Sequence, residues 1–496
     1  MSIFLRSEKL FLFICAGLGG LLSGLALIYG WVFFMWLGIA LLWLASVDVF
    51  AGFLWGFVVV LISHSWLLAL HPLNWIGVPT PLSLPIAIAI WMFCGGFGGF
   101  LVGLWSWLAN TSLLLGLRNG AFLGKLIFAL FLSSVWGLAE VVLAHYPLFW
   151  IGVGGSVLPA DRFLAGLAKW IGAGGLATVQ LLIGFWLWQT AFAFGRGIRW
   201  RKPFFLGLCL VIFAHLIGSS LLSKNYSPES ISLALWQPDI PIRTRFSYEK
   251  QNSLPQEIQE ALQKAKDLSA SFLVAPEGML NANQELLSPA PIPFLAGGFR
   301  WVKGEQRSAL LVFDKGETTY SSALDKYRLV PLGERVPNFS QFPKSGLSAV
   351  GGLEPGTYSR LLSWSGPPLA GAICYELSDG HALAEAVKGG AQWILAIANL
   401  DPYPISLQRQ FVALSQLRSI ETERNLISVA NTGPSISVLA SGEVQSVIPP
   451  FREGTELAEI TLNRDLTGYA RWQEAPLIAL FLISLFGISL IWLWGK

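Results

Sequence analysis

Long apolar stretches dominate both ends of the chain. Seven of them lie within the first 222 residues, and an eighth lies close to the C-terminus. A helix needs about 20 apolar residues to cross the hydrocarbon core of a bilayer, so these stretches predict membrane-spanning helices. The predicted spans are 10–29, 31–47, 50–70, 85–109, 122–144, 166–194, 203–222 and 475–494.

The long segment between the seventh and eighth spans has a different pattern, in which short β-like runs alternate with helical runs. The predicted strands are 231–235, 272–275, 309–313, 369–373, 393–398 and 426–430, and the predicted helices are 254–268, 381–388 and 405–423. Such alternation indicates an α/β domain with a layered sheet. We therefore predict a transmembrane domain of seven spans at 1–222, an extramembrane domain at 223–473 and a last transmembrane helix at 474–496.

Composition and charge agree with this division. The chain of 496 residues is 54% hydrophobic but only 13% charged, whereas soluble globular proteins carry roughly 25% charged residues. A net charge of +3 is too small to indicate nucleic-acid binding. Basic residues collect before the first span and after the fourth and sixth, so the positive-inside rule places these segments in the cytoplasm. Seven spans then place 223–473 on the outer side.

Few polar residues interrupt the predicted spans, and Glu140 is the most deeply placed ionisable one. Ionisable residues are costly in lipid and are usually paired or functional. We interpret Glu140 as a hydrogen-bond partner between helices. The alternative is a site for a lipid amine.

Cys374 is the one cysteine outside the apolar stretches, since Cys15, Cys94 and Cys209 all lie in predicted spans. It therefore has no disulfide partner in its own domain, and no spacing typical of a metal site occurs. Cys374 directly follows a predicted strand and precedes a predicted helix. Backbone N–H groups at such a turn can stabilise a thiolate and an oxyanion. A buried structural cysteine is the competing interpretation.

Charged residues follow two other apolar runs. Glu277 comes after the predicted strand 272–275, where partial burial would suit its carboxylate for general-base work. Lys326 and Glu334 lie in the sequence Lys-Tyr-Arg-Leu-Val-Pro-Leu-Gly-Glu-Arg-Val-Pro. Lys326 could stabilise a tetrahedral intermediate, and Glu334 could orient Lys326. Ordinary solvated loop residues are the alternative for all three.

In type, order and spacing, Glu277, Lys326 and Cys374 resemble the Glu-Lys-Cys triad of the nitrilase superfamily, which is carried on an αββα sandwich. The surrounding sequences match as well: Pro-Glu-Gly at Glu277, the twelve residues from Lys326, and Ile-Cys-Tyr-Glu at Cys374. Three matches in the right order are a far more specific signal than one. The resemblance implies a nitrilase-like αββα fold for the extramembrane domain.

A nitrilase-like domain between seven helices and one C-terminal helix is similar to the apolipoprotein N-acyltransferases of the bacterial cytoplasmic membrane. Further matches are Gln237-Pro-Asp-Ile-Pro241, Ala139-Glu140 and Val429-Ala-Asn-Thr-Gly433. One loop departs from the family. Where the family usually has an Asn-Asp-x-Trp-Phe-like loop, this chain has Asn399-Leu-Asp-Pro-Tyr403. Asn399 and Tyr403 are the candidate substrate-binding residues of this altered loop.

The resemblance implies a two-step acyl transfer. Glu277 would be the general base, Cys374 the nucleophile and Lys326 the oxyanion stabiliser. The assisting residues would be Glu334, Tyr375 and Glu376. An acyl chain would pass from a membrane phospholipid to a thioester on Cys374, and then to the N-terminal α-amine of a diacylated apolipoprotein. The expected partners are this donor, this acceptor and the lipid bilayer, with no metal or cofactor, no nucleic acid and a monomeric enzyme on the periplasmic side.

Three other interpretations stay open at this point. A membrane-tethered nitrilase-type amidase acting on a soluble amide would carry the same triad, although seven spans exceed what a tether needs. A transporter or scaffold with an external binding domain would not require Cys374. A dyad of Cys374 with His381, the only histidine of the external domain, would not require Glu277.

Overall fold

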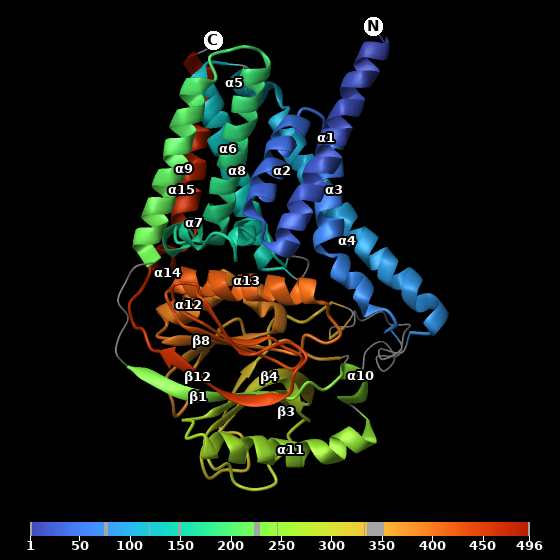
Figure 1. Ribbon diagram of the computed structural model, residues 1–496, viewed down its shortest axis with the longest axis vertical. Helices are drawn as coiled ribbons and strands as arrows, with labels where there is room; N and C mark the ends of the chain where they lie inside the picture. The colour runs from blue at the N-terminus through green and yellow to red at the C-terminus, as the bar shows by residue number, and fades with distance from the viewer. Residues whose placement is uncertain are drawn as a thin grey trace. The chain divides into compact units, whose positions relative to one another are not determined.

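The computed structural model describes residues 2–73, 78–118, 120–146, 150–222, 229–245, 247–331, 333–334 and 352–494. The chain divides into two compact units. One contains Met1–Leu68, Pro85–Leu222 and Trp472–Lys496, and the other contains Ala69–Leu84 and Ser223–Arg471. Figure 1 labels their helices and strands.

A helix lies at each predicted span, and all of these helices belong to the first unit except for the first turn of α4. These are α1 (Ser2–Tyr29), α2 (Val32–Ala45), α3 (Val49–Ser63), α4 (Thr80–Ala109), α6 (Phe122–Ala144), α8 (Ala168–Gly195), α9 (Arg201–Leu222) and α15 (Ala475–Trp494). Six helices of the described chain, all of these but α2 and α3, are long and apolar enough to cross a membrane. The predicted multi-pass membrane bundle is confirmed.

Helices α2 and α3 are shorter than predicted, with 14 and 15 residues. At about 1.5 Å per residue, neither matches a hydrocarbon core of about 30 Å. The apolar run that begins with α3 breaks at His64 and continues as the 3₁₀-helix η1 (Ser65–Leu70). Further short helices that the sequence did not predict are α5 (Ser112–Arg118), η3 (Val153–Val157) and α7 (Arg162–Ala165).

Glu140 on α6 accepts hydrogen bonds from η3 and from its own helix. Its carboxylate accepts hydrogen bonds from Trp136 Nε1–H at 2.9 Å, from Val153 N–H at 2.7 Å and from Gly154 N–H at 3.3 Å. Gly152 permits this approach, because a Cβ there would lie 2.3 Å from Glu140 Oε2. Glu140 therefore satisfies backbone donors that would otherwise be unpaired inside an apolar unit, as the structural interpretation predicted.

Glu140→Leu is expected to destabilise the first unit. It leaves the three donors without an acceptor, which costs about 1–3 kcal/mol for each buried group. Thermal unfolding of the detergent-solubilised protein measures this as a lower melting temperature. Val142→Leu, at a position on α6 that is 57% exposed, is the matched control. Equal melting temperatures for the two variants would contradict the bonding role of Glu140.

The second unit is built on two six-stranded sheets. The first sheet contains β12 (Gly454–Thr461), β1 (Ser230–Gln237), β2 (Leu273–Leu280), β3 (Phe294–Val302), β4 (Glu305–Phe313) and β5 (Ser322–Asp325), in that order. The second contains β11 (Val444–Ile448), β10 (Ser435–Val438), β9 (Leu426–Ala430), β8 (Trp393–Ala398), β7 (Leu369–Ile373) and β6 (Leu361–Leu362). In each sheet three consecutive strands, β1–β2–β3 and β7–β8–β9, run parallel.

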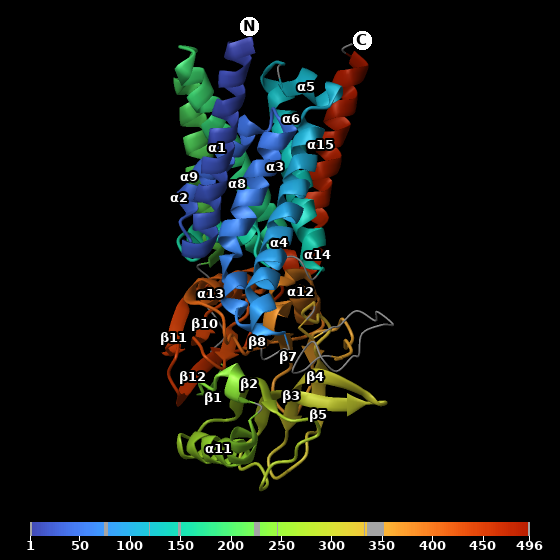
Figure 2. The ribbon, with the colours of Figure 1, turned by 90° about the vertical axis from the view of Figure 1, so that its right-hand side faces the viewer.

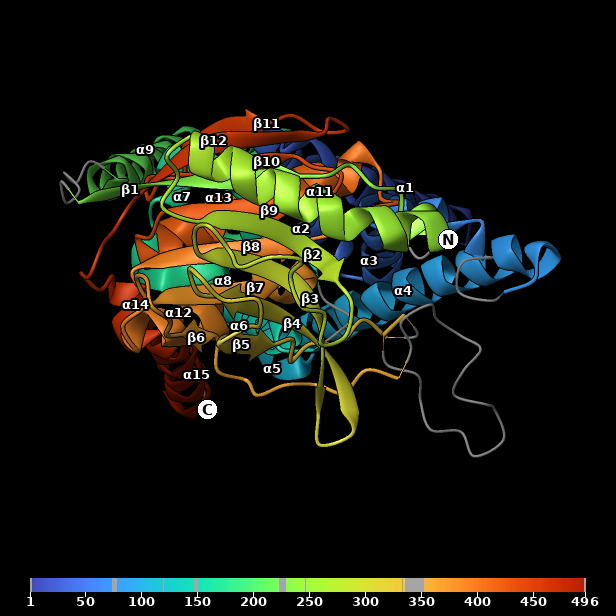
Figure 3. The ribbon, with the colours of Figure 1, turned by 90° about the horizontal axis from the view of Figure 1, so that it is seen from below.

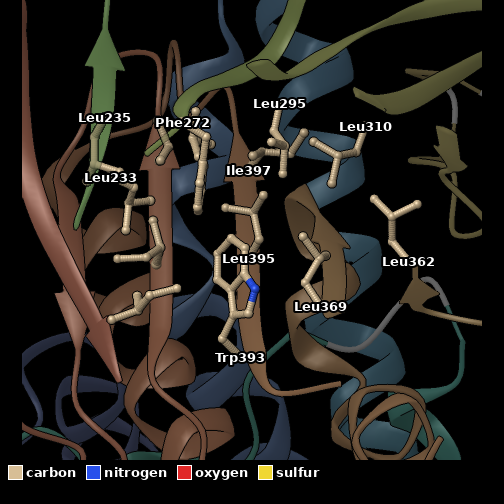
Figure 4. Close-up of a cluster of buried hydrophobic side chains, with 14 of the residues drawn as sticks. Leu233, Leu235, Phe272, Leu295, Leu310, Leu362, Leu369, Trp393, Leu395 and Ile397 are labelled. Carbon is tan, nitrogen blue, oxygen red and sulfur yellow. The ribbon is translucent and has the colours of Figure 1, made fainter. Parts of the chain in front are cut away.

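Alternate residues of the strands face two different cores, since side chains alternate across a sheet. Leu233 and Leu235 of β1 belong to the hydrophobic core between the two sheets, which also contains Leu395 of β8 (Figure 4). Ala234 on the opposite face packs against α11 (Tyr248–Asp267). Figure 3 shows α11 in front of β1 and β2, which it contacts.

Helices α12 (Gly380–Lys388) and α13 (Ile405–Thr422) pack against β7 and β9 of the second sheet. Figure 2 shows both helices on one side of β7 and β8. The layers of the second unit are therefore helix, sheet, sheet and helix. The predicted αββα sandwich is confirmed.

Candidate active site

Cys374 lies at the turn between β7 and α12. It begins the 3₁₀-helix η4 (Cys374–Ser378) directly after the strand, and its φ is +56°. This left-handed conformation is rare for a residue with a side chain, and such strained residues cluster at functional sites. The thiol is partly buried and packs against the core between the sheets. The structure thus places Cys374 at the predicted strand-to-helix turn.

Lys326 follows β5 and is almost completely buried, with 1% of its surface exposed. Its ammonium Nζ donates to Glu277 Oε1 at 2.8 Å and to Glu334 Oε1 at 2.7 Å. Burial alone lowers the pKa of Lys326, but the two facing carboxylates raise that pKa well above its ordinary value. Lys326 is therefore a fixed positive charge held between two carboxylates.

Glu277 is positioned by β2 and β3, by the loop after β5 and by the end of β8. It lies on β2, where the pairing with β3 becomes irregular after Ala275. Gly297 on β3 allows the close approach, because a Cβ there would lie 2.4 Å from Glu277 Cα. Glu277 Oε1 receives Lys326 Nζ, and Oε2 receives the backbone N–H of Asn399 at 3.3 Å. The carboxylate is thus tied to the loop after β5 and to the end of β8.

The charges of Glu277, Lys326 and Glu334 act on the Cys374 thiol. Burial raises the pKa of Cys374, and the Glu277 carboxylate raises it further. Lys326 and the backbone N–H of Tyr375 lower that pKa, without reversing the shift. The carboxylate of Glu334 also raises the pKa of Cys374. The thiol is therefore protonated at neutral pH and needs a base before it can attack.

Glu376 connects the turn that contains Cys374 with the loop that contains Lys326. Its Oε1 receives the backbone N–H groups of Tyr327 at 2.7 Å and Arg328 at 3.2 Å. Its Oε2 receives the N–H of Ile373 at 2.9 Å. Burial raises the pKa of Glu376 above its ordinary value, although the Arg360 guanidinium and the N–H groups of Ile373 and Arg328 lower it. Glu376 thus holds the residues beside Lys326 and Cys374 in fixed positions.

Tyr375 makes a second connection between the same two segments. Its hydroxyl donates to Leu329 O at 2.7 Å. The Arg328 guanidinium lies over its ring, with Cζ 4.5 Å from the centroid. Through these contacts Tyr375 joins the turn after β7 to the loop that follows Lys326.

Comparison with known proteins identifies the family. No family model matches the chain. A curated protein named apolipoprotein N-acyltransferase, from Prochlorococcus marinus (strain MIT 9313), is 56% identical over 472 residues and 95% of both chains. The chain belongs to the apolipoprotein N-acyltransferase family. A protein of that name from a second strain of Prochlorococcus marinus is 53% identical over 97% of both chains. One from Parasynechococcus marenigrum (strain WH8102) is 48% identical over 94% of this chain and 98% of its own length.

About half of this chain aligns with each of two solved structures. Saccharomyces cerevisiae Nit3, of branch 10 of the nitrilase superfamily, has 15% identity and a TM-score of 0.35 over 48% of this chain and 92% of its own. An amidase from Nesterenkonia sp. has 18% identity and a TM-score of 0.35 over 52% and 98%.

The loop after β8, which contains Asn399 and Tyr403, reaches Glu277. Asn399 contributes its backbone N–H to Glu277, while its side-chain Oδ1 accepts from Asn431 Nδ2 at 2.8 Å. Burial raises the pKa of Tyr403, and the charges of Cys374 and Glu277 raise it further.

Several polar residues of this family member were missed from sequence. Tyr327 Oη donates to Asp379 Oδ2 at 2.7 Å, and Asp379 also caps α12 by accepting the Ala382 N–H. Arg360 is 1% exposed and pairs with Glu376. Only two apolar residues, Leu361 and Leu362, separate Arg360 from Ser363, so no local sequence pattern singles Arg360 out. Among the described side chains, no group of His, Cys, Asp and Glu could hold a metal ion.

Proposed function

We propose that this chain transfers an acyl chain from a membrane phospholipid, through a thioester on Cys374, to the N-terminal α-amine of an apolipoprotein's diacylglyceryl-cysteine. Family membership over nearly the whole chain supports this proposal. The observation that carries the mechanism is the buried Lys326, paired with Glu277 and Glu334, whose charges act on a cysteine at a strained turn.

The first step forms the acyl-enzyme. Glu277 takes the proton of the Cys374 thiol, and the sulfur attacks the carbonyl carbon of a phospholipid ester. The negative charge that develops on the carbonyl oxygen is stabilised by Lys326 and by backbone N–H groups of the turn. The C–O bond then breaks. The departing lysophospholipid oxygen takes the proton from Glu277, which leaves a thioester on Cys374.

The second step uses the acceptor amine. The N-terminal amine of the diacylglyceryl-cysteine attacks the thioester carbonyl, and Lys326 again stabilises the oxyanion. Glu277 takes a proton from the attacking nitrogen. The C–S bond breaks, and the proton returns to the Cys374 sulfur. A thiolate is a better leaving group than an alkoxide, which explains why a cysteine suits transfer from an ester to an amine.

Both substrates are lipid-anchored, so the enzyme must work at a bilayer. The six long apolar helices give it a membrane anchor of the required kind. We place the catalytic unit on the periplasmic side of the cytoplasmic membrane, from the distribution of basic residues between the spans. We expect a monomer, because one chain supplies the whole triad.

Transfer of a labelled acyl chain tests this function. The purified protein is incubated with a phospholipid labelled in its acyl chains and a synthetic diacylated lipopeptide with a free N-terminus. The expected products are an N-acylated lipopeptide and an equal amount of lysophospholipid. A lipopeptide whose N-terminus is acetylated should yield no product. Release of ammonia from a soluble amide, without transfer of label, would instead support the amidase alternative.

A further inference from the structure

Residues 356–360 form a strap beside the loop that carries Lys326. At one end, the Gly356 N–H donates to Lys326 O at 2.8 Å. At the other end, Arg360 O accepts the N–H of Gly371, on β7, at 2.9 Å. The strap therefore bonds at one end to Lys326 and at the other to β7, the strand that directly precedes Cys374.

The strap closely fits the loop, because Gly356 has no side chain. A Cβ at this position would lie 2.4 Å from Asp325 Cβ and 2.8 Å from Asp325 O. Any other residue at position 356 would push the strap away from the lysine loop. The close contact between the strap and Asp325 thus depends on a glycine at position 356.

The Arg360 guanidinium brings together acceptors from several segments. Its Nη1 donates to Glu376 Oε2 at 3.0 Å and its Nη2 to Asp325 O at 2.9 Å. Its Nε donates to Tyr358 O at 3.2 Å. Its Cζ lies over the Tyr327 ring, 4.6 Å from the centroid. These partners come from the strap, from the loop around Lys326 and from the turn after Cys374.

We infer that Arg360 is a positioning residue that fixes Lys326 relative to Cys374. It contacts Asp325, which precedes Lys326, and Glu376, which holds the backbone on both sides of the site. A guanidinium is planar, so its N–H groups hold these acceptors in a fixed relation that a single ammonium cannot reproduce. The inference rests on the proposed roles of Lys326 and Cys374.

Two variants separate positioning from simple folding. Arg360→Lys keeps the charge that faces Glu376 but loses the planar set of donors. Removing Arg360 alone would leave a buried carboxylate unpaired, which is strongly destabilising. The double variant Arg360→Met/Glu376→Gln avoids this by removing both charges together. Lys250→Met is the control, because Lys250 forms an ion pair with Glu257 on α11, outside the site.

The test is the pH dependence of Cys374 alkylation by iodoacetamide, measured on the full chain by peptide mass spectrometry. Lys326 lowers the pKa of Cys374, so a displaced Lys326 should raise that pKa. We expect the double variant to react about tenfold more slowly than wild type at a given pH, which corresponds to about one pKa unit. The alkylation rate of Arg360→Lys should lie between those of wild type and the double variant. Lys250→Met should react at the wild-type rate.

If the double variant melts like wild type and also shows the wild-type pH dependence of Cys374 alkylation, the inference is wrong. A full wild-type profile for Arg360→Lys would also overturn it, since charge alone would then suffice. Arg360→Lys decides the question if the double variant does not fold. Absence of acyl transfer by the wild-type chain would refute the proposed function separately, because the alkylation profile does not depend on the acyl donor.

Discussion

Replacing Cys374 with alanine is expected to reduce acyl transfer by about 10⁴-fold or more, because no thioester can form and no other group replaces the nucleophile. The measurement is the initial rate of lipopeptide N-acylation from phospholipid. The variant should still fold, since the cysteine side chain is small and only partly buried, and alanine removes nothing but the sulfur.

Cys209→Ala is the matched control for this substitution. Cys209 is an exposed cysteine on α9, in the other unit. This variant should keep the wild-type rate. A Cys374→Ala protein that retained half of the wild-type rate would contradict the covalent mechanism and would favour a role for the chain as a scaffold.

Glu277→Gln is expected to lower the acyl-transfer rate by about 10²–10⁴-fold, the usual contribution of a general base. The same variant should show the opposite effect on alkylation. The Glu277 carboxylate raises the pKa of Cys374, so removing its charge should lower that pKa. Iodoacetamide should therefore modify Cys374 faster at a given pH, even though the enzyme turns over more slowly.

The opposite signs of these two effects identify the role of Glu277. A residue that only supported the fold would slow catalysis without making the thiol more reactive. Glu305→Gln is the control, because the Glu305 carboxylate is 52% exposed and pairs with Arg307. It should leave both rates unchanged. Slower alkylation in Glu277→Gln would contradict the electrostatic account of the site.

The helical part of the fold was predictable because long apolar runs have few alternative structures. The sequence did not reveal that the second and third runs form short helices. In the run 50–70, no charged residue or proline marks the break at His64. Gly30 follows the end of α1 with a φ of +70°, and such a glycine is a boundary that sequence can signal.

Some strands could be predicted from the sequence, and others could not. The six predicted strands all exist, and β7, β8 and β9 have the predicted limits. The strand β3 was missed, because Gly297 and Gly298 interrupt its apolar pattern. The strand β12 pairs with β1 although the two are far apart in the sequence, with Ser230 opposite Thr461. No local pattern encodes such a pairing.

The sequence predicted which residues form the candidate site better than it predicted their positions and hydrogen bonds. Glu277 was expected after a strand, yet it lies within β2, where an irregular pairing displaces the backbone. The bonds of Lys326 to both Glu277 and Glu334 follow from the fold and could not be read from spacing. Arg360 was missed for the same reason, since its partners come from separate segments of the chain.

Detection of an acyl group on Cys374 tests the central claim most directly. The protein is incubated with a phospholipid of known acyl chains and no acceptor, and the intact mass and the Cys374 peptide are then measured. We predict a mass increase of one acyl chain, carried on Cys374, which disappears when a diacylated lipopeptide is added and reappears in the N-acylated product. Formation of that product by a protein whose Cys374 is never acylated would contradict the mechanism.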